Sequence, residues 1–350
     1  MRERFNLGMG ILVIFFVLQC SKKNKVIAAG PNDQVPLSSM VEEGPSPHST
    51  ETEATKKDSV HTLGDVQNLT KKTITYRPWN IKGNDSLKKA FLKTYTGLDL
   101  HSILALNRLD RKNMYRADTL IVPDQLEPDF LAYSPFPYSV RTINTIPKIA
   151  FFSYPLQAYV LYEYGKQVKW GPTSMGSKIY QTPRGLYFTN WKGKEIISTV
   201  SDEWKLKWNF NIANYEGIGW HQYNLPGYPA SHSCLRLLEE DAKWLYNWAD
   251  QWILNKGGAS VRAKGTPVVV YGEYPWGKRK PWRQLLENPT SNDLSEEKLT
   301  QIVSPYLIEI KKEQNNRQKV LEEIKEGAAK NIQQDSIKPE KKLLGFLFYR

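Results

Sequence analysis

Apolar positions along the chain follow three successive patterns. Between residues 81 and 123 they recur at helical spacing and then form a short run closed by Pro123, which predicts two short helices leading to a strand. From Ile146 to Tyr274 the runs are short and rich in β-branched and aromatic residues ("KIAFFS", "AYVLYEY", "GLYFTNW", "TPVVVYGEY"), which predicts strands. Helical spacing returns beyond Trp276, where Pro305 is expected to break the run.

One helix is expected to interrupt the β region, directly after Cys234. Four apolar residues share one face of it, and three acidic residues occupy its first turn, where the helix dipole favours negative charge (Leu238, Ala242, Leu245, Ala249; Glu239, Glu240, Asp241). The predicted fold is therefore a mainly β domain with one helix, preceded by a small α+β module and followed by a solvated helical appendage.

Residues 1–20 have the composition of an export signal. Arg2 and Arg4 precede an apolar run that is too short to span a bilayer, and the run ends near Cys20 instead of a small-residue cleavage site. This arrangement resembles a bacterial lipoprotein signal peptide. The resemblance implies lipidation of Cys20 and a periplasmic protein that is lipid-anchored to the envelope membrane.

The remaining boundaries follow from changes in composition. Residues 21–75 are rich in Pro, Ser, Thr, Glu and Lys and poor in aromatic residues, which predicts a disordered tether. We place the α+β module at 76–125, the β domain at 140–275, and a basic, helical C-terminal extension at 276–350.

The formal net charge of +12 favours an anionic partner. Nucleic acid, anionic lipid and a carboxylate-rich polymer all satisfy this charge. Because export would remove the protein from nucleic acid, we expect no nucleic-acid partner.

Cys234 is the only cysteine of the chain besides Cys20, and the β region holds only two histidines, His221 and His232. A cysteine reacts as a thiolate, and an adjacent histidine is one means of generating it. The order excludes a papain-like peptidase, whose histidine follows the nucleophile. A zinc site would have an uncommon ligand spacing, and a buried inert thiol beside core histidines is the other alternative.

The segment "SHSCLRL" at 231–237 resembles the Ser-His-Gly-Cys-x-Arg signature of the L,D-transpeptidase catalytic domain (YkuD-type). "TSMGSKIYQTPRG" at 173–185, "DAKWLYNW" and "GTPVVVY" resemble further segments of that family in the same order. The resemblance implies a β-sandwich-like catalytic domain.

The same resemblance implies roles for six residues. Cys234 would be the nucleophile and His221 the base, with His232 as a second candidate for the base. Ser231 would orient the loop, and backbone N–H groups near Ser233 and Cys234 would stabilise the oxyanion. Arg236 would bind a substrate carboxylate or serve as a structural ion-pair partner.

Ser233 stands where the family has glycine. If that position requires a positive φ, serine costs about 1 kcal/mol of strain or shifts the oxyanion donors. The neighbouring aromatics Trp204, Trp208, Phe210 and Trp220 either cover a cleft or belong to the core.

Residues 81–123 partly resemble a LysM carbohydrate-binding module, through Gly83 to Leu87, the pair Leu106 and Asn107, and the closing strand Asp118 to Pro123. A small helical subdomain without sugar binding is the alternative.

The resemblances together imply a peptidoglycan L,D-transpeptidase that forms 3-3 cross-links between stem peptides through a cysteine acyl-enzyme. Such an enzyme needs no cofactor and no metal, because the thioester conserves the bond energy. Its partners would be stem peptides, glycan and the membrane that holds the lipid anchor, with the oligomeric state left open. The alternatives are an L,D-carboxypeptidase or other hydrolase of the same fold, and a non-catalytic peptidoglycan-binding lipoprotein.

Overall fold

Residues 71–198 and 203–337 are described by this computed structural model, with side chains up to residue 330. The predicted signal peptide with Cys20 and most of the predicted tether lie outside the described residues. All described residues belong to one compact unit. In that part of the chain, no helix combines the length and the apolar character needed to cross a membrane.

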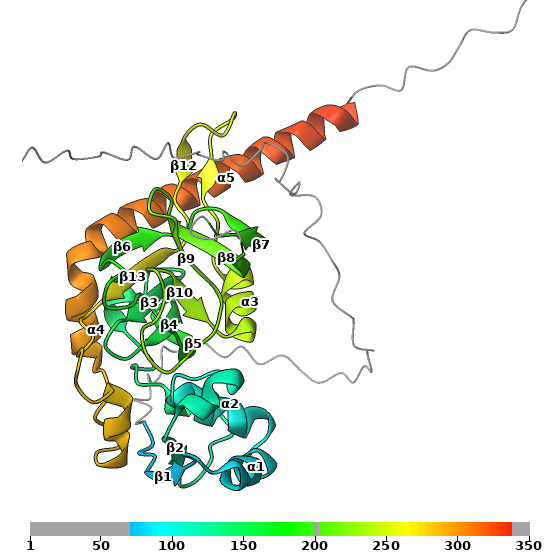
Figure 1. Ribbon diagram of the computed structural model, residues 1–350. Coiled ribbons are helices and arrows are strands. Elements are labelled where there is room, and N and C mark those ends of the chain that lie inside the picture. Colours follow the sequence, from blue (N-terminus) through cyan, green and yellow to red (C-terminus); the bar gives the residue numbers. More distant parts are fainter. Residues whose placement is uncertain (1–70, 199–202, 338–350) are drawn as a thin grey trace, which may run out of the picture. The chain divides into compact units, whose positions relative to one another are not determined.

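The N-terminal module has the order strand, helix, helix, strand (Figure 1). It comprises β1 (Tyr76–Asn80), α1 (Asp85–Thr94), α2 (Gly97–Leu106), a 3₁₀ turn η2 (Arg111–Arg116) and β2 (Thr119–Pro123), with β1 and β2 antiparallel. Asn84 begins α1 by accepting a hydrogen bond from the N–H of Leu87 at 2.9 Å. Both predicted helices and the predicted strand are present, whereas β1 was not predicted.

Strand β2 separates two hydrophobic cores. Leu120 and Val122 are buried in the module's own core, while Ile121 between them is buried in the main core of the protein. Successive strand residues point to opposite faces, so one short strand serves both cores. Leu106, at the end of α2, also belongs to the main core. The module is therefore packed onto the β domain and shares its interior.

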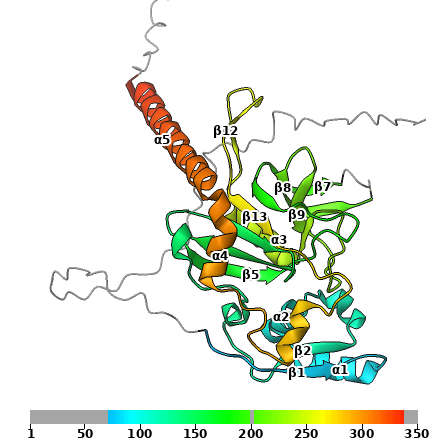
Figure 2. The same ribbon diagram turned by 90° about the vertical axis from the view of Figure 1, so that its left-hand side faces the viewer.

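The β domain contains two main sheets (Figures 1 and 2). The five-stranded sheet has the order β5 (Lys166–Pro172), β4 (Ala158–Glu163), β3 (Ile149–Ser153), β13 (Pro267–Tyr271), β6 (Gly185–Phe188). The four-stranded sheet has the order β10 (Leu235–Leu237), β9 (Ile218–Gln222), β8 (Lys205–Ala213), β7 (Lys192–Ile197). A small hairpin pairs β11 (Ile253–Leu254) with β12 (Val261–Ala263), and 3₁₀ turns η3 (Phe130–Tyr133) and η4 (Arg141–Ile143) precede strand β3.

Aromatic side chains join the two main sheets. The ring of Phe152 on β3 stacks on that of Trp220 on β9 with centroids 6.0 Å apart, and Phe210 on β8 contacts the same indole at 5.3 Å. All three residues have no exposed surface. The predicted mainly β architecture is present, and helix α3 (Glu239–Trp248) follows Cys234 as predicted.

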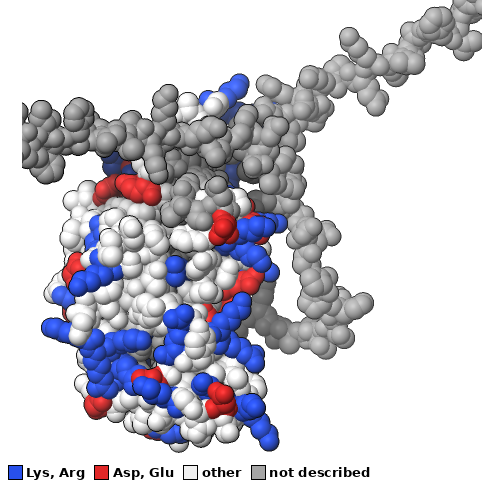
Figure 3. All heavy atoms as spheres, viewed as in Figure 1, with Lys and Arg blue, Asp and Glu red and all other residues white. Residues whose placement is uncertain are grey.

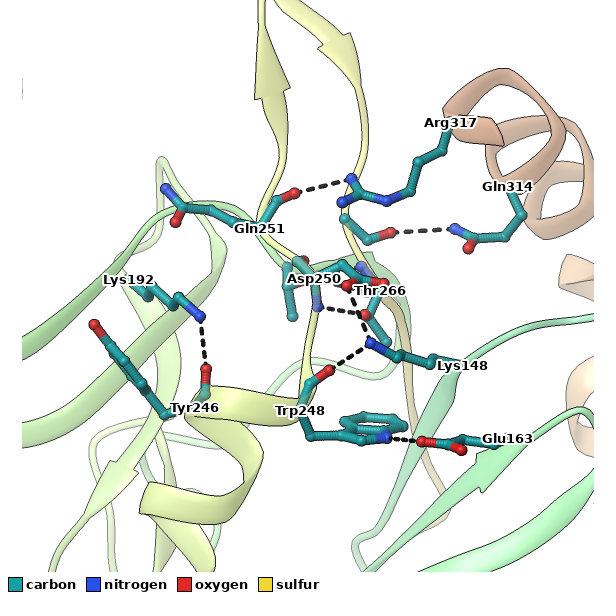
Figure 4. Close-up of polar contacts among 12 residues, drawn as sticks. Lys148, Glu163, Lys192, Tyr246, Trp248, Asp250, Gln251, Thr266, Gln314 and Arg317 are labelled. Carbon is teal, nitrogen blue, oxygen red and sulfur yellow. Dashed lines mark hydrogen bonds and ion pairs between the residues drawn. The ribbon is translucent and has the colours of Figure 1, made fainter. Parts of the chain in front are cut away.

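Figure 4 shows how the segment after α3 is fixed. Lys148 Nζ donates to the carbonyl of Trp248 at 2.8 Å and pairs with Asp250 at 3.1 Å, while the Trp248 indole donates to Glu163 at 2.7 Å. These contacts anchor the C-terminal end of α3 to strands β3 and β4. The helix that follows the predicted nucleophile is thus tied at its far end to the main sheet.

The C-terminal extension contains η5 (Pro281–Leu286), α4 (Glu296–Val303), η6 (Ser304–Tyr306) and α5 (Leu307–Ile337), with the expected break at Pro305. The expectation of a solvated appendage is wrong for its first half. Leu299, Val303 and Ile310 are buried in the main core. Arg317 donates to the carbonyl of Gln251 at 2.9 Å (Figure 4) and to the carbonyl of Lys264 at 3.0 Å. The apolar stripe of these helices is therefore a packing face.

Candidate active site

The strands β9 and β10 bring Cys234 and His221 close together in the fold. They run parallel, with Leu235 opposite Trp220 and Arg236 opposite His221. Cys234 directly precedes β10, so the continued register places it beside Gly219, two residues before His221. Neighbouring strands lie about 4.8 Å apart, and diagonal partners on one face remain within reach of longer side chains.

Alternation of side chains puts these residues on one face of the sheet. Leu235, Leu237 and Trp220 point into the core and have no exposed surface. Residues one position away point to the opposite face. Cys234, Arg236 and His221 therefore share the face that turns away from the core.

The half-buried Cys234 thiol lies at the turn between β8 and β9, with its sulfur 3.9 Å from the carbonyl oxygen of Gly217. Burial raises the pKa of this thiol, while a hydrogen bond from the backbone N–H of Gly219 and the charge of Arg236 act in the opposite direction. The resting group is therefore a thiol at neutral pH. A base must remove its proton before or during attack.

His221 is arranged as that base. Its side chain is buried, and Nδ1 lies 2.9 Å from the carbonyl oxygen of Gln222. Because a carbonyl oxygen can only accept, Nδ1 carries the proton in the neutral ring and Nε2 keeps a free lone pair. Burial, together with the charge of Arg236, lowers the pKa of His221 to about 4, against a favourable contribution from the Gln222 carbonyl. The imidazole is thus neutral at pH 7.

Arg236 presents a guanidinium without a carboxylate partner among the described residues. Its Cζ lies 4.5 Å from the centre of the Tyr223 ring, and both of its backbone groups pair with Ser174 at 3.1 Å. Burial lowers its pKa, although the group stays charged. Of its two predicted roles, a structural ion pair finds no partner in the described chain, and binding of a substrate carboxylate remains a prediction.

Ser233 adopts a left-handed backbone conformation with φ of 79°. Such a conformation favours glycine, so the serine is strained by about 1 kcal/mol. Its hydroxyl donates to the carbonyls of Tyr180 and Gln181 at 3.2 and 3.3 Å, which offsets part of that strain. The predicted cost of replacing glycine here therefore has a structural basis.

The segment 173–182 holds the loop that carries Cys234. Thr182 Oγ1 donates to the carbonyl of Ser233 at 2.8 Å and accepts from the N–H of Gly176 at 2.9 Å. Ser231 is buried, and its hydroxyl donates to the carbonyl of Cys234 at 2.5 Å. Ser231 thus uses its hydroxyl within the loop, which makes it a positioning residue.

The backbone N–H groups of Ser233 and Cys234 donate to no acceptor within residues 71–198 and 203–337. Unpaired donors next to a nucleophile are suited to a developing oxyanion. The strained φ of Ser233 helps to set the direction of both groups.

His232 lies on the surface of the loop that carries Cys234. Its exposed ring stacks on Tyr180 with centroids 4.4 Å apart and tilts against Trp204 at 5.4 Å. No hydrogen bond joins it to Cys234 in the described chain. Its geometry fits an aromatic contact at the rim of the site better than the role of base.

The aromatic stretch before His221 divides between the two predicted roles. Phe210 and Trp220 are core residues with no exposed surface, and Trp208 packs against Tyr246 at 5.6 Å. Only Trp204 of these four lies beside the loop, through His232.

Sequence reasoning did not identify three contributors to the site. Tyr180 stacks on His232, Tyr223 lies under Arg236, and Gly219 faces the sulfur. A Cβ at Gly219 would come 2.5 Å from the carbonyl oxygen of Phe210, so only glycine fits. The closely spaced glycines in "GIGW" could have indicated the requirement for glycine at position 219. Among the described residues, no group of three or more His, Cys, Asp and Glu is placed to hold a metal ion.

Comparison with known proteins yields one family match. Residues 147–270 match the family model for the L,D-transpeptidase catalytic domain, YkuD. No curated protein matches the chain.

Solved structures similar to the chain include three L,D-transpeptidases. That from Stackebrandtia nassauensis is 25% identical and covers 37% of this chain and 57% of its own, with a TM-score of 0.30. The L,D-transpeptidase from Mycobacterium smegmatis is 18% identical and covers 36% of this chain and 59% of its own, with a TM-score of 0.29. L,D-transpeptidase 3 from Mycobacterium tuberculosis is 20% identical and covers 44% of this chain and 74% of its own, with a TM-score of 0.28. The chain thus spans less than two thirds of the first two relatives.

The fold and the site define a β domain that presents a lone cysteine and a histidine on one face. This domain of the chain belongs to the YkuD family of L,D-transpeptidase catalytic domains.

Proposed function

We propose that the protein is a peptidoglycan L,D-transpeptidase that forms 3-3 cross-links between stem peptides. The observation that carries this proposal is the register of β9 and β10, which places Cys234 and a neutral His221 on one face of the sheet. The family match of residues 147–270 supports the same reaction class.

The reaction would proceed in two acyl transfers. Cys234 Sγ attacks the carbonyl carbon of the third residue of a tetrapeptide stem, and His221 Nε2 takes the thiol proton. Collapse of the tetrahedral intermediate breaks the C–N bond, and the proton leaves with the amine of D-alanine. The side-chain amine of a second stem then attacks the thioester, which forms the new amide and regenerates the thiol.

Two groups near Cys234 support this chemistry. The N–H groups of Ser233 and Cys234, which have no acceptor among the described residues, would receive the oxyanion, where one donor typically contributes about 3 kcal/mol to lowering the barrier. The guanidinium of Arg236, which forms no ion pair with the described residues, would bind a carboxylate of the donor stem. Its positive charge also favours the thiolate.

The same proposal includes a location and a wall contact. Lipidation at Cys20 would hold the protein at the envelope membrane, facing the periplasm, and the segment 21–75 would act as a tether. The N-terminal module, with its strand–helix–helix–strand order, would bind glycan. These assignments are supported by the sequence patterns and by the net charge of +12, which suits a polymer rich in carboxylates.

Labelling with a carbapenem, which mimics an acyl donor, tests the nucleophile. We expect intact-protein mass spectrometry to show one adduct on the wild type, mapped to Cys234 by peptide analysis, and none on Cys234→Ala. The His232→Ala variant should still be acylated, whereas His221→Ala should react at least about tenfold more slowly. An adduct at another residue, or none on a folded wild type, would contradict the proposal.

A further inference from the structure

The segment Gly277–Arg283 gathers four basic residues next to the loop that carries Cys234, outside the domain of residues 147–270. Figure 3 shows basic side chains concentrated on that face in the region of η5. Arg279 pairs with Glu287 at 2.8 Å, and Arg283 donates to the carbonyl of Thr119 at 3.3 Å. Lys280 lies between them and forms no ion pair with any carboxylate in the described chain.

Lys280 is held partly buried between two aromatic rings. Its Nζ lies 5.8 Å from the ring centre of Tyr228 and 6.0 Å from that of Trp282. Trp282 is buried, whereas Tyr228 is 41% exposed and precedes Cys234 by six residues. Desolvation, helped by the charge of Arg283 and opposed by the charge of Asp118, lowers the pKa of Lys280. A half-buried ammonium that forms no ion pair in the described chain is unfavourable, and a bound anion would relieve that cost.

Ser174 links Lys280 to the candidate active site. Its hydroxyl donates to the carbonyl of Tyr228 at 2.8 Å, and its backbone groups pair with both backbone groups of Arg236. Tyr228 and Arg236 are therefore both hydrogen-bonded to Ser174. Arg236 and Lys280 each lie against a tyrosine ring, and neither forms a salt bridge with a carboxylate of the described chain.

We propose that Lys280, with Tyr228 beneath it, forms a second carboxylate subsite that binds the peptidoglycan stem at a distance from the bond under attack. Stem peptides carry more than one carboxylate, so Arg236 and Lys280 can each hold one. This inference rests on the proposed function. It assigns the C-terminal extension a part in substrate binding.

The test measures calorimetric binding of a disaccharide-tetrapeptide to the full chain carrying Cys234→Ala. Lys280→Met keeps the length of the side chain and removes its charge. We expect it to weaken binding by about tenfold, the effect of one charged hydrogen bond. Lys280→Arg should restore binding. Lys278→Met, an exposed neighbour in the same segment, is the matched control and should bind like the parent.

A stem with amidated carboxylates provides the second arm. The parent and Lys280→Met should bind it equally. Equal binding of the free-acid stem by the parent and by a folded Lys280→Met would overturn the subsite. Absence of Cys234 acylation with the Lys280 effect intact would overturn the proposed reaction and leave the subsite standing.

Discussion

Ser233 is the residue whose backbone decides the shape of the candidate oxyanion site. Its φ of 79° is a conformation that glycine adopts freely, yet its hydroxyl makes two hydrogen bonds to the segment 180–181. The strain and the hydrogen bonds have similar magnitudes, on the order of 1 kcal/mol each. A single substitution therefore changes both, and a pair of variants is needed to separate them.

We predict that Ser233→Gly is more stable than Ser233→Ala by about 1 kcal/mol. Both variants lose the hydroxyl, but only alanine keeps the Cβ that makes a positive φ unfavourable. Urea unfolding monitored by tryptophan fluorescence gives the two free energies of unfolding. Equal values for the two variants would show that the backbone at this position is unstrained.

His221 should impose an unusual pH dependence on acylation. Only the neutral ring can accept the Cys234 proton, and burial lowers the pKa of this ring to about 4. Lowering the pH therefore leaves the base active until the pH approaches that value. Between about pH 7 and about pH 5.5, protonation of His221 should not reduce the rate of carbapenem acylation. The rate should fall steeply only below about pH 5. A midpoint near 6.5, the ordinary value for imidazole, would contradict the buried base.

At the scale of elements, the N-terminal module braces the loop that leads to Cys234. The backbone N–H of Asp110 donates to the carbonyl of Leu225 at 3.1 Å. In return, the Asp110 carboxylate accepts from the N–H of Leu225 at 2.7 Å. The other carboxylate oxygen accepts from the N–H of Asn113 at 2.7 Å and caps η2. Gly227, with φ of 81°, lies against Leu109.

Replacing Asp110 with alanine should therefore cost about 1–3 kcal/mol of unfolding free energy, because a cap and a bond to Leu225 are lost together. It should also slow acylation of Cys234, since the loop 224–228 becomes less constrained. Asp85→Ala is the matched control: its exposed carboxylate pairs only with Lys88 on the same helix, and the loss should stay within about 0.5 kcal/mol. Equal losses for the two variants in urea titrations would rule out the bracing role.

The elements differ in how well their sequences predict them. Strands β3, β4 and β13 are short, β-branched, buried runs, and their sequences predict them directly. Strands β7 and β8 carry lysines on an exposed face, and β1 contains Pro78, so no apolar run marks them. In the parallel pairing of β9 with β10, paired residues are 15 positions apart in the sequence. No local pattern predicts such a pairing.

The candidate site shows the same limit. The sequence predicts Cys234, His221 and Arg236 as site residues because the chain has few cysteines and histidines and because their spacing resembles that of a known family, and their roles remain predictions. Their shared face, the tautomer of His221 and the stacking of His232 on Tyr180 depend on tertiary contacts. Ser233 was predictable as an exception, but the sign of its φ required the structure.

At the scale of the whole described chain, the three parts share one interior. Arg108 of the module is buried, donates to the carbonyl of Leu156 at 2.8 Å, and lies over the rings of Trp170 and Trp282. These three partners belong to the β domain and to the C-terminal extension. Deleting the module would therefore expose the β domain's core, so the proposed glycan binding of the module is better tested by surface substitutions than by deletion.

Product analysis on the full chain tests the central claim most directly. Purified protein incubated with disaccharide-tetrapeptides should yield cross-linked dimers and free D-alanine, detected by mass spectrometry, and Cys234→Ala should yield neither. Tripeptides without dimers would assign the acyl-enzyme to hydrolysis. Absence of both products from correctly folded wild-type protein would contradict the claim that Cys234 and His221 form a catalytic pair.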